Sequence, residues 1–173
     1  MYLTFRISVL DRFKDKEYIN WLKGTLCLQY TKEGLEDFVD RTSVEYHGSI
    51  TRQILQAYQC PNQCDIEKFR SDKFQCPGGM CNDLKTTLQV PSTERWRNTT
   101  IEGIKTSPNE LAKLYMPVFC SKQYDGPKTA DCTAILNLMY DCPFFWGKID
   151  NSALVEQVFI RTAHISSVSF GQT

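Results

Sequence analysis

The sequence lacks an excess of charge of either sign. Its 173 residues include 20 Lys and Arg and 20 Asp and Glu, so the formal net charge is zero. Proteins that bind nucleic acid through the phosphate backbone carry basic surfaces that displace counterions, and this balance indicates no such surface. We therefore do not expect DNA as a partner.

The sequence also lacks long apolar runs. No uninterrupted stretch approaches the roughly 18 apolar residues of a membrane span. The apolar opening is interrupted by Arg6 and ended by the charged stretch 11–16, so it does not form the apolar core of a secretory signal. We expect no membrane segment and a cytoplasmic, intracellular location.

Familiar catalytic motifs are missing as well. There is no P-loop, dinucleotide-binding fingerprint, serine elbow or HExxH sequence. A hydrophobic content of 42%, with 12% aromatic residues, nevertheless indicates a globular chain with a real core. The length suits one domain, residues 1–173, with or without a small inserted lobe.

Cysteine, in contrast, is abundant, with eight residues in the chain. Four of them are separated by three, eleven and four residues: Cys60, Cys64, Cys76 and Cys81. Two short knuckles that each supply two thiolates are typical of a structural zinc site. Gly78 and Gly79 can adopt the positive φ of such a knuckle. The spacing predicts one structural Zn²⁺ in an inserted lobe spanning residues 59–88.

Disulfides or buried free thiols are the alternatives, but a reducing compartment favours metal ligation. Four protein ligands leave no open coordination position, so the zinc is expected to be structural rather than catalytic. Structural zinc contributes roughly 10–16 kcal/mol of apparent binding free energy, as much as the whole stability of a typical domain. Loss of one thiolate is therefore expected to unfold at least this lobe.

The remaining cysteines give a weaker pattern. Their spacings are wide for a second metal site: Cys27, Cys120, Cys132 and Cys142. Cys27, Cys132 and Cys142 lie in apolar helical contexts, where cysteine behaves as a small hydrophobic residue. We favour that structural role over a second site.

Apolar residues that recur at helical spacing predict an all-α fold, a helical bundle around the cysteine lobe. The expected helices are 17–28, 31–58 with a break at Gly48, 82–88, 108–116, 129–140 and 152–166. Thr31 and Thr129 are the expected N-caps of two of them, and Ser107 with Glu110 forms a capping box. We expect the large aromatic side chains to be core rather than a stacking platform: Trp21, Phe38, Trp96, Phe144, Phe145 and Trp146.

Many further positions match a known family in the same order. Outside the lobe these are Glu17, Tyr18, Asn20, Trp21, Lys23, Cys27, Leu28, Gly34, Leu35, Phe38, Val39, Arg41, His47, Leu111, Ala112, Lys113, Tyr115, Met116, Pro117, Asp131, Ala134, Leu136, Leu138 and Cys142. Together with the four-cysteine lobe they resemble the uncharacterised vertebrate X-chromosome open-reading-frame family and its invertebrate relatives, which carries a cysteine-rich domain of unknown function. The resemblance covers about residues 17–145.

The closing helix of that family resembles HEPN domains, an all-helical class whose ribonuclease members use an arginine and a histidine four to six positions later. The resemblance implies that Arg161 and His164 would be this catalytic pair, although only two residues separate them. Histidine suits the base and arginine suits the stabilisation of a phosphorane. The structural alternatives are an arginine ion pair and a histidine at the helix C-terminus. Arg41 and His47 have the expected spacing but lie in the wrong helix.

Two functions remain open on the sequence alone. The first, which we favour, is a non-catalytic, zinc-stabilised helical module that acts by protein–protein contact or self-association. The second is a metal-independent ribonuclease or RNA-binding domain that uses Arg161 and His164.

Overall fold

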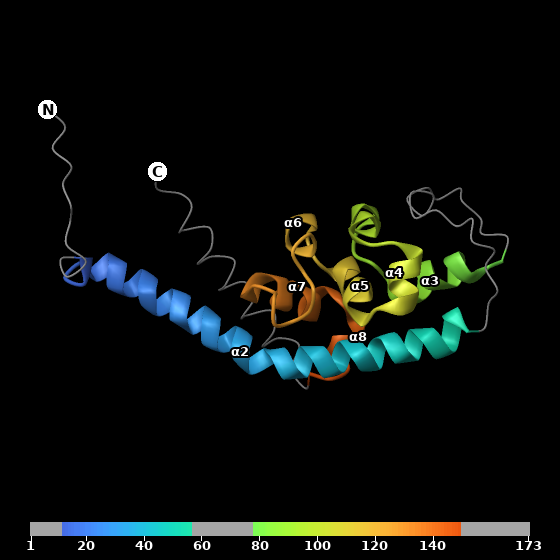
Figure 1. Cartoon of the computed structure of the whole chain (residues 1–173), viewed down its shortest axis with the longest axis horizontal. Coiled ribbons are helices and arrows are strands. Elements are labelled where there is room, and N and C mark those ends of the chain that lie inside the picture. The colour runs from blue at the N-terminus through green and yellow to red at the C-terminus, as the bar shows by residue number, and fades with distance from the viewer. Residues whose placement is uncertain (1–11, 57–77, 150–173) are drawn as a thin grey trace, which may run out of the picture.

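The computed structural model describes residues 12–56 and 78–149, and every regular element within them is helical (Figure 1). This confirms the all-α prediction for the described part of the chain. The elements are α2 (Lys16–Ile50), η1 (Thr51–Leu55), α3 (Met80–Leu88), η3 (Thr93–Asn98), α4 (Ile101–Thr106), α5 (Pro108–Ala112), η4 (Lys113–Tyr115), α6 (Val118–Ser121), α7 (Cys132–Asp141) and α8 (Pro143–Trp146). None of these helices is both long enough and apolar enough to cross a membrane.

One long helix, α2, organises the arrangement. It runs unbroken for 35 residues, with Asp15 as its N-cap accepting from the Glu17 amide at 2.8 Å. The predicted break at Gly48 was wrong, and so was the predicted division into two helices between residues 28 and 31. A glycine inside a helix costs only about 1 kcal/mol, and Gly48 is not forced into a positive φ. Thr31, the predicted N-cap, instead donates its hydroxyl to the Cys27 carbonyl at 2.8 Å, inside the helix.

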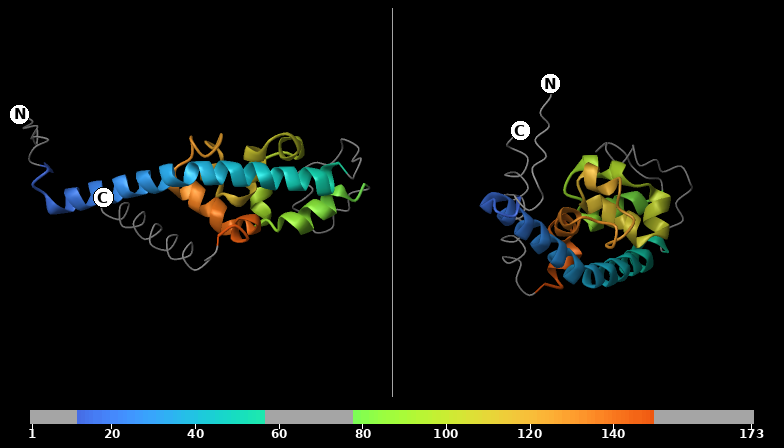
Figure 2. Two further views of the ribbon diagram at one scale, coloured as in Figure 1. Left: turned by 90° about the horizontal axis from the view of Figure 1, so that it is seen from below. Right: turned by 60° about the vertical axis from the view of Figure 1, so that its left-hand side comes forward.

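The short helices cover only part of α2. Figures 1 and 2 show the second half of α2 lying along the cluster of short helices, while its first half extends beyond them. Burial follows the same division, because no residue from 12 to 34 is buried, whereas Val39, Tyr46 and Ile50 are. The apolar residues at these later positions face α5 and α7, which pack against α2.

The core is formed by residues that the sequence marked as apolar. Trp96 is 2% exposed and fills the interior from η3, as predicted. Ile135 and Leu138 of α7 are also buried, whereas Tyr140 of the same helix is 39% exposed. An ion pair between Arg95 and Asp141, at 2.6 Å, joins η3 to α7.

Of the other two predicted helix caps, Ser107 was right and Thr129 was wrong. Ser107 caps α5 and accepts from the Glu110 amide at 3.4 Å, with Pro108 in the first turn. This helix is shorter than predicted and continues as a 3₁₀ turn before Pro117. The expected cap Thr129 was wrong, because Asp131 caps α7 by accepting from the Ala134 amide at 2.7 Å.

A chain of buried hydroxyl groups ties α2 to the short helices. Tyr115 donates to the Leu88 carbonyl at 2.6 Å, and its oxygen lies 2.8 Å from the Tyr46 hydroxyl. Because Tyr115 has a single hydroxyl hydrogen, Tyr46 must be the donor to Tyr115. Burial, more than any neighbouring group, raises the pKa of both tyrosines well above 10.0, so both stay neutral. These bonds link α2, η4 and the end of α3.

We expect Tyr115→Phe to lower the free energy of unfolding by about 2–3 kcal/mol. The substitution removes both hydrogen bonds and leaves the Leu88 carbonyl and the Tyr46 hydroxyl without this partner in the core. Tyr46→Phe is the matched control, because it removes one bond and leaves the Tyr115–Leu88 bond in place; its cost should be nearer 1 kcal/mol. Urea unfolding measures both, and equal stabilities of the two variants would contradict this order.

Candidate functional site

The predicted zinc site lies mostly outside the described residues. Cys60, Cys64 and Cys76 all fall within 57–77, and the structure describes only Cys81. Cys81 is the second residue of α3 and is 2% exposed within the hydrophobic core. Gly79 precedes this helix with φ of 74°, the positive value expected of a knuckle glycine.

The two ends of the cysteine segment lie close together. The segment leaves α2 after η1 and returns at α3, and η1 and α3 pack against each other. A segment whose ends are adjacent can be an insertion that leaves the surrounding helices undisturbed. The fourth predicted ligand is therefore anchored in the core of the helical body.

The predicted catalytic pair cannot be placed. Arg161 and His164 both lie outside the described residues. The other arginine–histidine pair is described and does not converge: Arg41 is exposed and its Nε donates to the Asp37 carbonyl at 3.2 Å, whereas the His47 Nε2 lies 3.0 Å from the Ile104 carbonyl. His47 therefore joins α2 to α4, as a structural contact.

The second set of cysteines does not gather into a metal site. Among residues 12–56 and 78–149, no three His, Cys, Asp or Glu side chains are grouped as metal ligands. Burial raises the pKa of Cys120 to about 11 and that of Cys142 to about 12. Both thiols are therefore protonated at neutral pH, as suits cysteines packed in a core. Cys27 is exposed, so the expectation that it packs as a small apolar residue was wrong.

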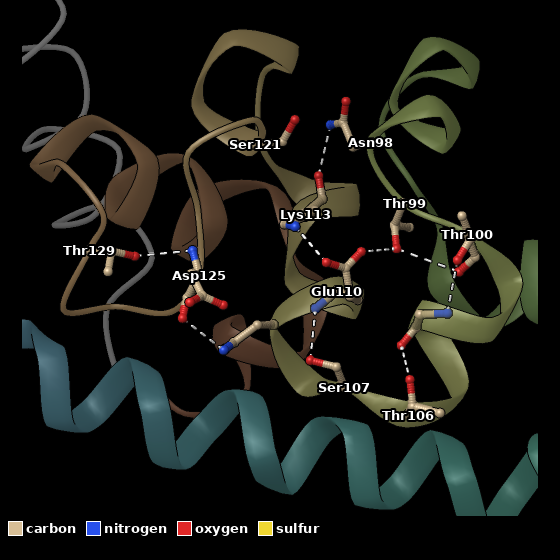
Figure 3. Close-up of polar contacts among 12 residues, drawn as sticks. Asn98, Thr99, Thr100, Thr106, Ser107, Glu110, Lys113, Ser121, Asp125 and Thr129 are labelled. Carbon is tan, nitrogen blue, oxygen red and sulfur yellow. Dashed lines mark hydrogen bonds and ion pairs between the residues drawn. The ribbon is translucent and has the colours of Figure 1, made fainter.

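A polar cluster around Glu110 was missed by the sequence analysis. Figure 3 shows the Glu110 carboxylate between Thr99, whose hydroxyl donates at 2.5 Å, and the Lys113 ammonium group. Gly103 lies so close that a Cβ there would be 2.9 Å from the Thr99 hydroxyl oxygen. The capping-box pattern assigned Glu110 to the helix start, although its carboxylate in fact joins α5 to the end of η3.

Burial favours a raised pKa for Glu110, but the hydrogen bonds from Lys113 and Thr99 outweigh it and the pKa is lowered. The carboxylate is therefore ionised and satisfied at neutral pH, as suits a structural ion pair. Nothing in its surroundings poises it as a general base near neutral pH. Catalysis by this cluster is not indicated.

The strongest functional feature is the first half of α2, residues 16–34, which we call the α2 arm. Trp21 is 53% exposed, Leu26 40% and Tyr30 67%. At the tip, Tyr18 stacks on Trp21 with ring centroids 5.9 Å apart, and Phe13 contacts the edge of Tyr18. The expectation that Trp21 is core was wrong, and the same holds for Trp146, also 53% exposed.

The comparisons with known proteins agree on one family. A family model described as "Domain of unknown function (DUF4559)" matches residues 12–169. The mouse (Mus musculus) protein named "Uncharacterized protein CXorf38 homolog" is 25% identical over 171 residues, which cover 94% of this chain and 52% of the mouse protein. The chain thus spans about half the length of this relative. No solved structure matches.

We expect Glu110→Gln to destabilise the protein at neutral pH by roughly 1 kcal/mol, since the charge-assisted bond to Lys113 is lost. A carboxylate with a lowered folded-state pKa contributes stability above its unfolded pKa, near 4.5, and loses it as the pH falls through the folded value. The difference between parent and variant should therefore vanish in acid, once the pH has fallen below the lowered folded-state pKa of Glu110.

Urea unfolding at several pH values measures this effect. Glu102→Gln is the control, because the Glu102 side chain is 74% exposed and its Lys105 partner is 4.0 Å away. A Glu110→Gln variant that matches this control at neutral pH would show that the cluster does not stabilise the fold.

Proposed function

The chain belongs to the DUF4559 family, and from that premise we propose that it is a non-catalytic helical module, stabilised by structural zinc, that acts by protein–protein contact. The observation that carries the proposal is the exposed apolar surface of the α2 arm. Phe13, Tyr18 and Trp21 contact one another at the tip of the arm, and exposed groups of apolar side chains mark sites of interaction with other proteins. Exposed Trp and Tyr side chains are also the residues most enriched at the energetic centres of protein interfaces.

Zinc enters the proposal as a structural element. The spacing of Cys60, Cys64, Cys76 and Cys81 supports it, and so do the adjacent ends of the segment that carries three of these residues. Bound zinc would hold four thiolates in a closed site and would supply folding free energy to the lobe. The burial of Cys81 would transmit that stabilisation directly to the core around α3.

The alternative is a HEPN-like, metal-independent ribonuclease or RNA-binding domain that uses Arg161 and His164. It rests on the resemblance alone. The zero formal net charge argues against a dominant phosphate-binding role. The all-helical architecture is compatible with either function and does not decide between them.

The proposal predicts that protein capture depends on the arm. Tagged chain is used to capture proteins from a lysate of its own cells, beside a Trp21→Lys/Tyr30→Lys variant. Lysine at these two exposed positions of the arm should lower the recovery of specific partners about tenfold, since a few aromatic residues carry most of the binding energy in protein interfaces. A Val44→Lys/Phe119→Lys variant is the matched control, because these side chains are exposed apolar residues outside the arm.

Two results would contradict the proposal. One is equal recovery of every captured protein by parent and arm variant. The other is cleavage of mixed RNA by the parent in excess EDTA, with none by an Arg161→Ala/His164→Ala variant, which would favour the ribonuclease. Metal analysis of the same preparation should find about one zinc per chain; well under one, with intact disulfides, would remove zinc from the proposal.

A further inference from the structure

One stripe of α2 continues from the covered half of the helix onto the α2 arm. Its members are spaced alternately three and four residues apart: Trp21, Gly24, Leu28, Thr31, Leu35 and Phe38. At about 100° per residue these positions fall within roughly 100° of the helix circumference, so they share one face. We call this stripe the α2 seam.

The two ends of the seam have different surroundings. Leu35 and Phe38 are partly buried against the core, and the Phe38 ring packs edge-on with Phe145 of α8, with ring centroids 5.9 Å apart. None of the seam residues on the arm is buried, and Trp21 is 53% exposed. No heavy atom beyond the neighbouring turns of α2 lies within 4 Å of the position that a Gly24 Cβ would occupy. The seam is therefore covered at one end and open at the other.

The described chain ends beside α2. After α8, Lys148 pairs with Glu45 of α2 at 2.7 Å, and Ile149 is partly buried against the core. The exposed surface of α2 near this point is mostly charged: Asp37, Asp40, Arg41 and Glu45. The open end of the seam is apolar instead. A segment that follows Ile149 and has an apolar face would therefore bury that face on the arm.

The residues after Ile149 have such a face in their sequence. In the expected helix 152–166, five apolar residues fall within about 140° of the circumference: Leu154, Val155, Val158, Phe159 and Ile165. This stretch lies outside the described residues. The family model spans residues 12–169, so the stretch belongs to the same domain as the arm. As a helix it would be about 22 Å long, and the seam from Trp21 to Leu35 has the same number of residues.

We infer that the closing segment, residues 152–166, packs as a helix on the α2 seam and runs antiparallel to α2, from Leu35 towards Trp21. Two residues, 150 and 151, separate this segment from Ile149. A contact on so short a tether forms at an effective concentration of the order of mM, so a modest apolar contact is enough to populate it.

The inference does not rest on the proposed function. Leu26 and Tyr30 each lie about 160° round the helix from Leu28, and they are 40% and 67% exposed. With the closing segment on the seam, these two side chains stay free to bind a partner protein. Cover on one face by a tethered helix also protects the arm less than the core protects residues 35–50, so amide hydrogens of the arm exchange faster.

Amide hydrogen exchange of the full chain tests the inference. Val158→Lys places a charge in the apolar contact and should speed exchange over residues 21–34 at least about threefold, while exchange over residues 35–50 stays as slow as in the parent. Gln157→Lys is the matched control, because it adds the same side chain about 100° away round the expected helix and should leave the arm unchanged. No change in the arm with Val158→Lys, or equal acceleration by both variants, would overturn the inference.

The same contact is tested from the arm. Leu28→Lys should speed exchange over residues 152–166 at least about threefold, whereas Leu26→Lys, the same change away from the seam, should not. Leucine and lysine have similar helix propensities, so neither variant should unfold α2. An effect of Val158→Lys on the arm without this reciprocal effect of Leu28→Lys would place the segment elsewhere and overturn the inference.

Protein concentration distinguishes the chain's own segment from that of a second copy. Cover within one chain predicts the same exchange over residues 21–34 at low and at high micromolar concentration. Protection of the arm that appears only at the higher concentration would mean that a second copy supplies the cover, and it would contradict the inference. Partner capture through the arm is measured separately, so either result stands without the other.

Discussion

The structure depends on the contact between the second half of α2 and the short helices that follow it. Tyr46 sits at the centre of this contact, where it donates to Tyr115, which in turn donates to the Leu88 carbonyl. Buried hydroxyl groups stabilise a fold only when every donor and acceptor is paired, and an apolar environment makes an unpaired one costly. The chain of bonds therefore fixes α2, η4 and α3 in one relative position. Phe144 of α8 stacks on Tyr46 with ring centroids 4.7 Å apart, so α8 packs against the same part of α2.

This constraint divides α2 into two parts with different roles. From Leu35 onwards the helix is held by packing, and His47 adds a bond to the Ile104 carbonyl. Before Leu35 the same helix carries apolar residues that the short helices do not cover. The packed second half of α2 therefore holds the α2 arm in a fixed direction relative to the short helices. The segment that carries three of the predicted zinc ligands connects η1 to α3.

The sequence predicted the features that depend on local chemistry. Helical periodicity predicted the all-α class. Ser107 and Pro108 predicted the start of α5, and the size and apolar character of Trp96 predicted that it is buried. The prediction failed at positions where tertiary contacts, and not the local sequence, determine the structure. Gly48 did not break α2, because the packing of Tyr46 and Ile50 on either side outweighs the small cost of a helical glycine.

The candidate surface was missed for a related reason. Hydrophobicity shows that a side chain such as Trp21 avoids water, but not whether its own chain or another protein covers it. The short helices cover α2 only from about Leu35 onwards, and Trp21 lies outside that contact. Likewise, Glu110 has the sequence signature of a capping box, and only the fold brings Thr99 to its carboxylate. The zinc prediction rests on cysteine spacing, which is a local feature of the sequence, and of its four residues the structure describes Cys81.

Amide hydrogen exchange along α2 tests the division of this helix most directly. If the body holds the second half and another molecule covers the first, exchange should be slow over residues 35–50 at every protein concentration. Over residues 16–34 it should be fast in the protein alone and slow down when a captured partner protein is bound. Equal protection of both halves of α2 in the protein alone would contradict the account.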